Sequence, residues 1–244
     1  MSTSPDDYIH IAPNVRLGAG VDLQAPCILG KAPRGREEGE LDLVIGAGSI
    51  IRPFTTIYAG SVFGARLQTG QCVSIREDNV YGDDVSIGTV VRMECGNHIG
   101  DRVRIHSGTT MEYVTIEDDV FIGPNTVFAG DPHPMNCPRY SECRGGAIVR
   151  RLARIGAMCM IMPGVEIGED SIVGAASLVV KDVPPGMVVA GHPAKVIKPV
   201  SELTCPPGWF ERPYVWPPYA EPQPFDPGET CDDVPPRYEP PQPH

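Results

Sequence analysis

A segment rich in reactive side chains lies between Gly130 and Ile148. It holds a carboxylate, an imidazole, two thiols and a guanidinium, from Asp131, His133, Cys137, Cys143 and Arg144. A neutral imidazole titrates near pH 7, so it can remove a proton from an attacking hydroxyl or amine. Chemistry of this kind is usually placed on loops that a rigid scaffold supports. The segment is therefore the first candidate for a reactive site.

The thiols of the same segment allow other chemistry. The spacing His133-x3-Cys137-x5-Cys143 offers one imidazole and two thiolates, which suit zinc, but the sequence fixes no fourth ligand. A disulfide between Cys137 and Cys143 is a second alternative, and two free thiols are a third. We expect free thiols and no metal site, because two nearby loop cysteines are common.

An apolar residue recurs at every sixth position on both sides of this segment. Of the twelve positions from Ile45 to Met111 in steps of six, eleven are large and apolar. The series begins in an N-terminal piece at Ile11, Leu17 and Leu23. After Met111 it slips by one residue, runs from Ile116 to Phe128, and resumes from Val149 to Val179. No helix and no ordinary strand keeps a period of six, so the chain is built from repeats.

Glycine follows a longer rule, since Gly46, Gly64, Gly82 and Gly100 are eighteen residues apart. One tight corner thus recurs every three hexads, which predicts three short strands per coil and a triangular prism. Stacked coils would pair their backbones and bury one continuous core. We expect an all-β fold, a parallel β-helix of about eight coils between Ile11 and Pro184. A β-sandwich is the weaker alternative, because it would show alternation with period two and hairpin turns.

The repeats divide the chain into three regions. Residues 1–41 form an N-terminal coil and a polar excursion from Leu29 to Leu41, and residues 42–198 form the repeat domain with its loop at 130–148. Residues 199–244 form a tail whose prolines and aromatic rings, both tryptophans included, are dense. We expect this tail to be extended and to pack on the β-helix or on a neighbouring subunit, with a flexible tail as the alternative.

Composition excludes several classes of partner. The chain has 244 residues, 31 acidic and 20 basic side chains and a net charge of −11, so nucleic acid is not an expected partner. The longest apolar stretch, near residues 171–180, is about half of a membrane span, so no membrane partner is expected either. Asp6 and Asp7 stand where a signal peptide would carry positive charge, and a cytoplasmic protein with mostly reduced thiols is expected.

Two stretches near the end of the repeats carry a resemblance to a known family. Residues 161–177 read IMPGVEIGEDSIVGAAS, and residues 181–198 read KDVPPGMVVAGHPAKVIK. With the hexads of residues 42–198, they resemble the hexapeptide-repeat acyltransferases, in particular galactoside acetyltransferase-like enzymes and nucleotide-aminosugar N-acetyltransferases. The resemblance implies a left-handed coil, a homotrimer, and acetyl-CoA bound in each groove between neighbouring prisms.

The resemblance also implies roles for particular residues. The run from Ala129 to Pro134, AGDPHP, resembles the segment that carries the family's catalytic histidine, so His133 is the expected general base. Glu112, Tyr113 and Asp131 are expected to contact the acceptor. His106 stands where the galactoside enzymes have an asparagine, and binding the acceptor, sharing the base role and capping a corner remain open for it.

Cofactor positions are implied in the same way. Ala157 and Ala175 match positions whose backbone N–H groups contact the pantetheine arm, and Ala157 is also the candidate oxyanion donor. Lys181, Lys195 and Lys198 match positions near the adenine and phosphates, the alternative being a solvated cap over the last coil.

These expectations give an acetyl-CoA-dependent O- or N-acetyltransferase acting on a sugar, with a nucleotide-linked aminosugar as the leading acceptor. An acetyltransferase for a non-sugar amine or alcohol is the alternative. A zinc carbonic anhydrase on the same fold is disfavoured, because the six histidines lack the close spacing of three converging ligands. A trimeric scaffold without activity is the alternative from another class.

Overall fold

The structure is a computed structural model that describes residues 8–132, 137–139, 142 and 145–204. His133, Cys143, Arg144 and the aromatic tail from residue 205 therefore lie outside the described residues. None of the described residues forms a helix long and apolar enough to cross a bilayer.

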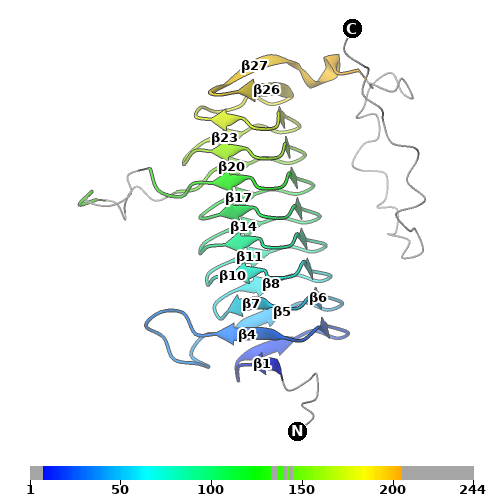
Figure 1. The fold of residues 1–244 in the computed structure, drawn as a ribbon, viewed down its shortest axis with the longest axis vertical. Coiled ribbons are helices and arrows are strands. Elements are labelled where there is room, and N and C mark those ends of the chain that lie inside the picture. Colours follow the sequence, from blue (N-terminus) through cyan, green and yellow to red (C-terminus); the bar gives the residue numbers. More distant parts are fainter. Residues whose placement is uncertain (1–7, 133–136, 140–141, 143–144, 205–244) are drawn as a thin grey trace. The chain divides into compact units, whose positions relative to one another are not determined.

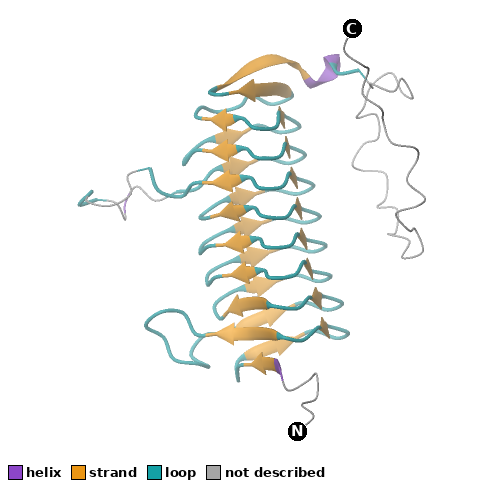
Figure 2. Ribbon diagram, viewed as in Figure 1, coloured by secondary structure: helices purple, strands orange, loops and turns teal. Residues whose placement is uncertain are grey.

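Short strands wind into three sheets, which we call A, B and C (Figures 1 and 2). Sheet A contains β1 (Ile9–Ile11), β4 (Cys27–Lys31), β7 (Thr55–Tyr58), β10 (Ser74–Ile75), β13 (Arg92–Met93), β16 (Thr110–Met111), β19 (Val127–Phe128), β22 (Met160–Ile161) and β25 (Leu178–Val179). Sheet B contains β2 (Val15–Leu17), β5 (Leu43–Ile45), β8 (Val62–Phe63), β11 (Val80–Tyr81), β14 (His98–Ile99), β17 (Thr115–Ile116), β20 (Ile148–Val149) and β23 (Glu166–Ile167). Sheet C contains β3 (Asp22–Leu23), β6 (Ile50–Ile51), β9 (Gln68–Thr69), β12 (Ser86–Ile87), β15 (Arg104–Ile105), β18 (Phe121–Ile122), β21 (Arg154–Ile155), β24 (Ile172–Val173), β26 (Met187–Gly191) and β27 (Ala194–Pro199).

Each strand pairs in parallel with the strand one full coil away. Ile57 aligns with Ile75, and Ile75 aligns with Met93, so one turn takes eighteen residues in this part of the chain. Strands β1 to β24 form eight sets of three. The last coil ends in an antiparallel hairpin of β26 and β27, followed by the short 3-10 helix η2 (Val200–Glu202). The predicted all-β parallel β-helix is confirmed.

The hexad residues fill the prism. Ile45, Ile51 and Ile57 are fully buried, and so is Thr69, the polar exception in the series. The Thr69 hydroxyl accepts the backbone N–H of Arg52 at 2.9 Å, which satisfies its oxygen inside the core. The expectation that the N-terminal piece continues the core is wrong in part: Ile11 and Leu17 are 44% and 38% exposed, because the described residues form no coil beneath them.

Three edges run along the prism, named here AB, BC and CA for the sheets that each one joins in chain order. Both excursions leave from edge AB, one between β4 and β5 and one between β19 and β20 (Figure 1). The side chains on each edge stack at the spacing of parallel strands, about 4.8 Å.

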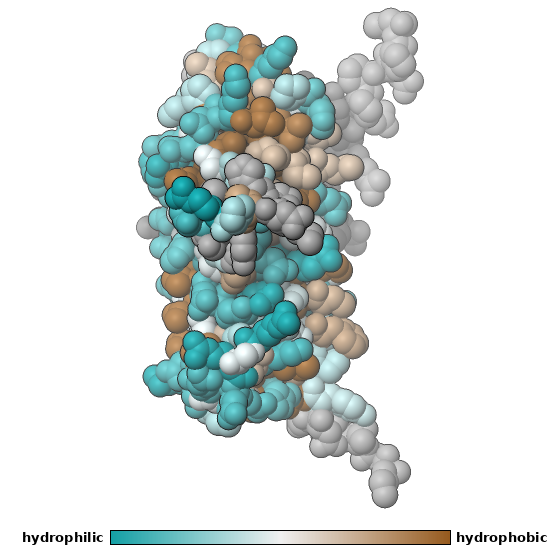
Figure 3. Space-filling model, turned by 90° about the vertical axis from the view of Figure 1, so that its left-hand side faces the viewer, coloured by the Kyte–Doolittle hydropathy of each residue, from teal (hydrophilic) through white to brown (hydrophobic). Residues whose placement is uncertain are grey.

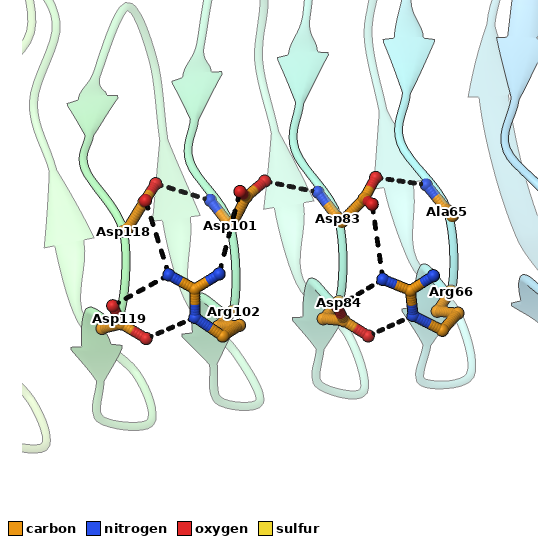
Figure 4. A network of polar contacts seen from close by, with 8 residues as sticks. All are labelled: Ala65, Arg66, Asp83, Asp84, Asp101, Arg102, Asp118 and Asp119. Atoms are coloured by element: carbon orange, nitrogen blue, oxygen red, sulfur yellow. Dashed lines mark hydrogen bonds and ion pairs between the residues drawn. The ribbon is translucent and has the colours of Figure 1, made fainter. Parts of the chain in front are cut away.

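Edge BC is a ladder of aspartates and arginines (Figure 4). The carboxylates of Asp83 and Asp101 accept the N–H groups of Ala65 and Asp83, one coil below, at 2.8 Å. The guanidinium of Arg66 bonds both oxygens of Asp84, at 2.5 and 2.6 Å, and these hydrogen bonds hold the pKa of Asp84 below its ordinary value. Because the side chains drawn in Figure 4 are paired with one another or with backbone N–H groups, this ladder stabilises the fold.

Candidate functional site

Strand β16 connects two of the predicted site residues. His106 lies on edge CA, four residues before Thr110, the first residue of β16, and Glu112 follows the strand on edge AB. The face of sheet A at β16 therefore extends between the two edges that carry the candidate residues. Edge BC carries none of them.

His106 replaces a glycine on edge CA. In five of the other seven coils its place is taken by Gly70, Gly88, Gly123, Gly156 and Gly174, and in the first two by Gln24 and Arg52. Coils pack tightly here, since a Cβ on Gly88 would lie 2.4 Å from the backbone nitrogen of Ser107. The exposed imidazole of His106 packs against Phe121, with ring centroids 4.8 Å apart. The sequence places this imidazole at the corner, and the structure adds its aromatic partner.

Glu112, Tyr113 and Asp131 meet where the loop of residues 130–148 leaves the prism. A Cβ on Gly130 would lie 2.8 Å from Oε2 of Glu112, so the loop begins against this carboxylate, and Asp131 is its next residue. The loop returns at Gly146, whose N–H donates to the carbonyl oxygen of Tyr113 at 3.1 Å. The predicted acceptor residues are thus brought together at the base of the segment that holds His133.

A ladder of buried asparagine amides supports the corner from which the loop leaves the prism. The Nδ2 of Asn97 donates to Oδ1 of Asn79 at 2.8 Å and to the carbonyl oxygen of Glu94 at 2.7 Å. Its own Oδ1 accepts the N–H of Val114 at 3.0 Å.

The corner after Glu112 is one residue shorter than the corners below it, which is the slip seen in the sequence. Tyr113 there adopts a left-handed backbone with φ of 55°.

Four residues spaced by eighteen stack along edge AB between the two excursions: Tyr58, Arg76, Glu94 and Glu112. The sequence analysis named only Glu112, although this spacing could have found the other three. Arg76 lies 2.6 Å from a carboxylate oxygen of Glu77 and 3.4 Å from one of Glu94. Figure 3 looks onto this edge, where hydrophilic surface covers the N-terminal excursion and apolar surface gathers near the C-terminal coils.

The candidate cofactor residues Ala157 and Ala175 lie on edge CA, above His106. Consecutive corners are linked by hydrogen bonds, such as the one from the Ala176 N–H to the Ala157 oxygen at 2.8 Å. In the described part of the chain, no acceptor binds the N–H of Ala157 or of Ala175, whereas the equivalent N–H of Thr89 donates to Ser107 Oγ at 3.2 Å. Small side chains beside free N–H groups fit the amide oxygens of a pantetheine arm.

Lys181 and Lys195 line one groove at the C-terminal end, between the last corner of edge AB and the β26–β27 hairpin. Exposed Val180 and Val196 line it as well. An ammonium pair with apolar walls fits phosphates and a flat base. Lys198 is not among the residues of this groove and lies opposite Val188 in the hairpin.

The zinc and disulfide alternatives for the loop of residues 130–148 depend on three side chains, of which the structure describes one. Cys137 is partly exposed and forms no disulfide with another described cysteine, whereas His133 and Cys143 lie outside the described residues. Over the ranges that the structure describes, no three metal-binding side chains gather. Free thiols, a disulfide and zinc therefore stay predictions for this loop.

The chain folds as a parallel β-helix, and the known proteins to which it is similar are acyltransferases. A family model described as the hexapeptide repeat of succinyl-transferase matches residues 153–179. Galactoside O-acetyltransferase of Escherichia coli is 38% identical over 92 residues, which cover 36% of this chain and 45% of that enzyme. The 2,3,4,5-tetrahydropyridine-2,6-dicarboxylate N-acetyltransferase of Clostridium perfringens is 46% identical over 85 residues, or 35% of this chain and 33% of that one.

Among solved structures, UDP-N-acetylglucosamine acyltransferase from Campylobacter jejuni aligns with a TM-score of 0.53 and 16% identity over 78% of this chain and 72% of that one. That likeness concerns the fold alone. Over the matched residues the chain is similar to hexapeptide-repeat acyltransferases. Its matches span less than half the length of the two acetyltransferase relatives.

Proposed function

We propose that this chain is an acetyl-CoA-dependent acetyltransferase that acetylates an amino or hydroxyl group of a sugar, with a nucleotide-linked aminosugar as the favoured acceptor. The main support is the arrangement along edge CA, where the N–H groups of Ala157 and Ala175 lack acceptors in the described residues above the imidazole of His106. Acetyl-CoA would supply an acetyl group already activated as a thioester.

The chain's own residues would bind, orient and deprotonate the acceptor. Glu112, Tyr113 and Asp131 would hold its polar groups at the base of the loop. His133 would accept the proton from the attacking amine or hydroxyl, as the family resemblance implies. The N–H of Ala157 would stabilise negative charge that develops on the carbonyl oxygen.

The assembly is part of the proposal. Since His106 and Glu112 lie on different edges of one prism, we expect a homotrimer in which each site is completed by a neighbouring chain. Light scattering coupled to size exclusion should give three times the 26.3 kDa of one chain. A cytoplasmic location, expected from the sequence, belongs to the same proposal.

A non-sugar amine is the second candidate acceptor. It is supported by the 46% identity to an N-acetyltransferase named for a dicarboxylate. A panel of sugar nucleotides and small amines, with release of the CoA thiol as the readout, separates the two acceptors. Absence of thiol release with the whole panel would favour a scaffold role.

Acetyl-CoA binding is tested by thermal unfolding. Acetyl-CoA should raise the Tm of the wild type but not of Ala175→Leu, in which a larger side chain covers the N–H groups of edge CA. Ala47→Leu is the matched control, because Ala47 is also exposed after a corner glycine but lies on edge BC. An equal Tm rise in all three proteins would contradict this binding site.

A further inference from the structure

Two arginines near His106 pair with no side chain that the structure describes. Acidic side chains outnumber basic ones, 31 to 20, and nine arginines in the described ranges form ion pairs with carboxylates. Arg92 and Arg104 are both exposed, and neither side chain forms an ion pair or a hydrogen bond with any described residue. In an acidic chain, such unpaired guanidiniums need an explanation outside the fold.

Their positions enclose the corner that carries His106. Arg104 lies on β15, two residues before His106, and its neighbours in sheet C are Ser86 and Phe121. Arg92 lies on β13 in sheet A, where its Cα partner Thr110 begins the strand that leaves the same corner. The two arginines therefore lie on the two sheets that meet at edge CA.

Among the described residues, the side chains beside Arg92 leave its guanidinium available. The neighbours of Arg92 in sheet A are Ser74 and Thr110, which have short uncharged side chains. Glu94, two residues beyond Arg92, is contacted by Arg76 at 3.4 Å. On edge BC the situation is reversed, because Arg102 already lies 2.7 Å from Asp119.

A guanidinium presents a planar fork of donors that matches a carboxylate or a phosphate. We propose that Arg92 and Arg104 recognise an anionic group of the acceptor, so that this enzyme acetylates an acceptor that carries a carboxylate or a phosphate. This inference rests on the proposed acetyltransferase activity. It narrows the acceptor class to anions, which include nucleotide-linked sugars and amino dicarboxylates and exclude simple glycosides.

The test compares Arg92→Gln and Arg104→Gln with the control Arg34→Gln. Arg34 is also exposed and without an ion pair to any described residue, but it lies in the N-terminal excursion. Release of the CoA thiol is followed with a nucleotide-linked aminosugar, an amino dicarboxylate and an uncharged aminosugar. We expect an anionic acceptor to be preferred, and the KM for that acceptor to rise about tenfold to a hundredfold in each test variant. The KM for acetyl-CoA and the Tm should stay unchanged, and Arg34→Gln should behave as wild type.

Three results would overturn the inference while the proposed activity stands. They are preference for the uncharged aminosugar, an unchanged acceptor KM in both test variants, and a rise in the KM for acetyl-CoA instead. Which anionic acceptor is acetylated decides between phosphate and carboxylate as the recognised group. If the wild type releases no CoA thiol and acetyl-CoA does not raise its Tm, the proposed activity itself is refuted, and the inference with it.

Discussion

The N–H of Gly146 donates to the carbonyl oxygen of Tyr113 at 3.1 Å, which fixes the point where the loop of residues 130–148 rejoins the prism. A Cβ added to Gly146 would lie 2.3 Å from that carbonyl oxygen, whereas one added to Gly145 would meet no atom within 4 Å. Two adjacent glycines therefore differ in what they tolerate.

Replacing Gly146 by Ala should displace the base of the loop. We expect a loss of about 1–3 kcal/mol in the free energy of unfolding, because backbone must move to relieve the contact. Denaturant unfolding and acetyl-transfer rates measure the effect, with Gly145→Ala as the control. Equal behaviour of the two variants would show that the loop is not anchored at Tyr113.

The hydroxyl of Tyr81 is buried in the core and finds no hydrogen-bond partner in the part of the chain that the structure describes. Its ring stacks on Phe63 at 4.6 Å between centroids. Tyr81→Phe keeps this stacking and removes an unsatisfied polar group, so stability should rise by about 1 kcal/mol. Calorimetry should show a higher Tm, and a lower Tm would mean that the hydroxyl is satisfied in solution.

The ion pairs of edge BC should make the free energy of unfolding depend on pH in the acid range. The pKa of Asp84 is lowered by the hydrogen bonds from Arg66, so this carboxylate stabilises the fold above its unfolded pKa of about 3.9. That contribution is lost as the pH falls through the pKa of Asp84 in the folded protein, which is lower. Asp84→Asn should therefore lower stability at pH 7 and leave a shallower decline below pH 4.

Urea unfolding between pH 7 and pH 2 measures this prediction. Asp22→Asn serves as control, since the Asp22 carboxylate bonds only Gln24 among the described side chains. Parallel stability curves for wild type and Asp84→Asn would contradict the role of the ladder.

The cysteines should differ in reactivity. Cys27 and Cys159 are buried and burial raises the pKa of both thiols, whereas Cys72 is exposed on edge CA. Because the thiolate is the reactive form, a thiol reagent should modify Cys72 well before the other two. Peptide mapping of the native protein identifies each site. Rapid labelling of Cys159 would contradict the packing of this corner.

The sequence predicted the core well because each strand contributes one inward residue at a fixed step. The position of Thr69 could be predicted in this way, although the partner that satisfies its hydroxyl could not. The step also located His106 and Glu112 at corners. Since one hexad separates them, they lie at consecutive corners, at the two ends of β16. The contact of His106 with Phe121 could not be predicted in this way, because it joins two coils between which the repeat slips by one residue.

That Arg92 and Arg104 pair with no described side chain could not be predicted from the sequence alone. It depends on the side chains one coil above and below, and on Glu94 being engaged by Arg76. An alignment of the sequence in rows of eighteen residues would have shown that Arg92 has short neighbours. It would not have shown which arginine each carboxylate pairs with.

The central claim is that this prism carries out acetyl transfer with a base supplied by its loop, and turnover of His133→Ala tests it most directly. With acetyl-CoA and an accepted substrate, we expect kcat to fall by about a hundredfold or more while acetyl-CoA still raises the Tm. His98→Ala, which removes an exposed imidazole from sheet B, should retain wild-type turnover. Wild-type turnover in His133→Ala would contradict the account.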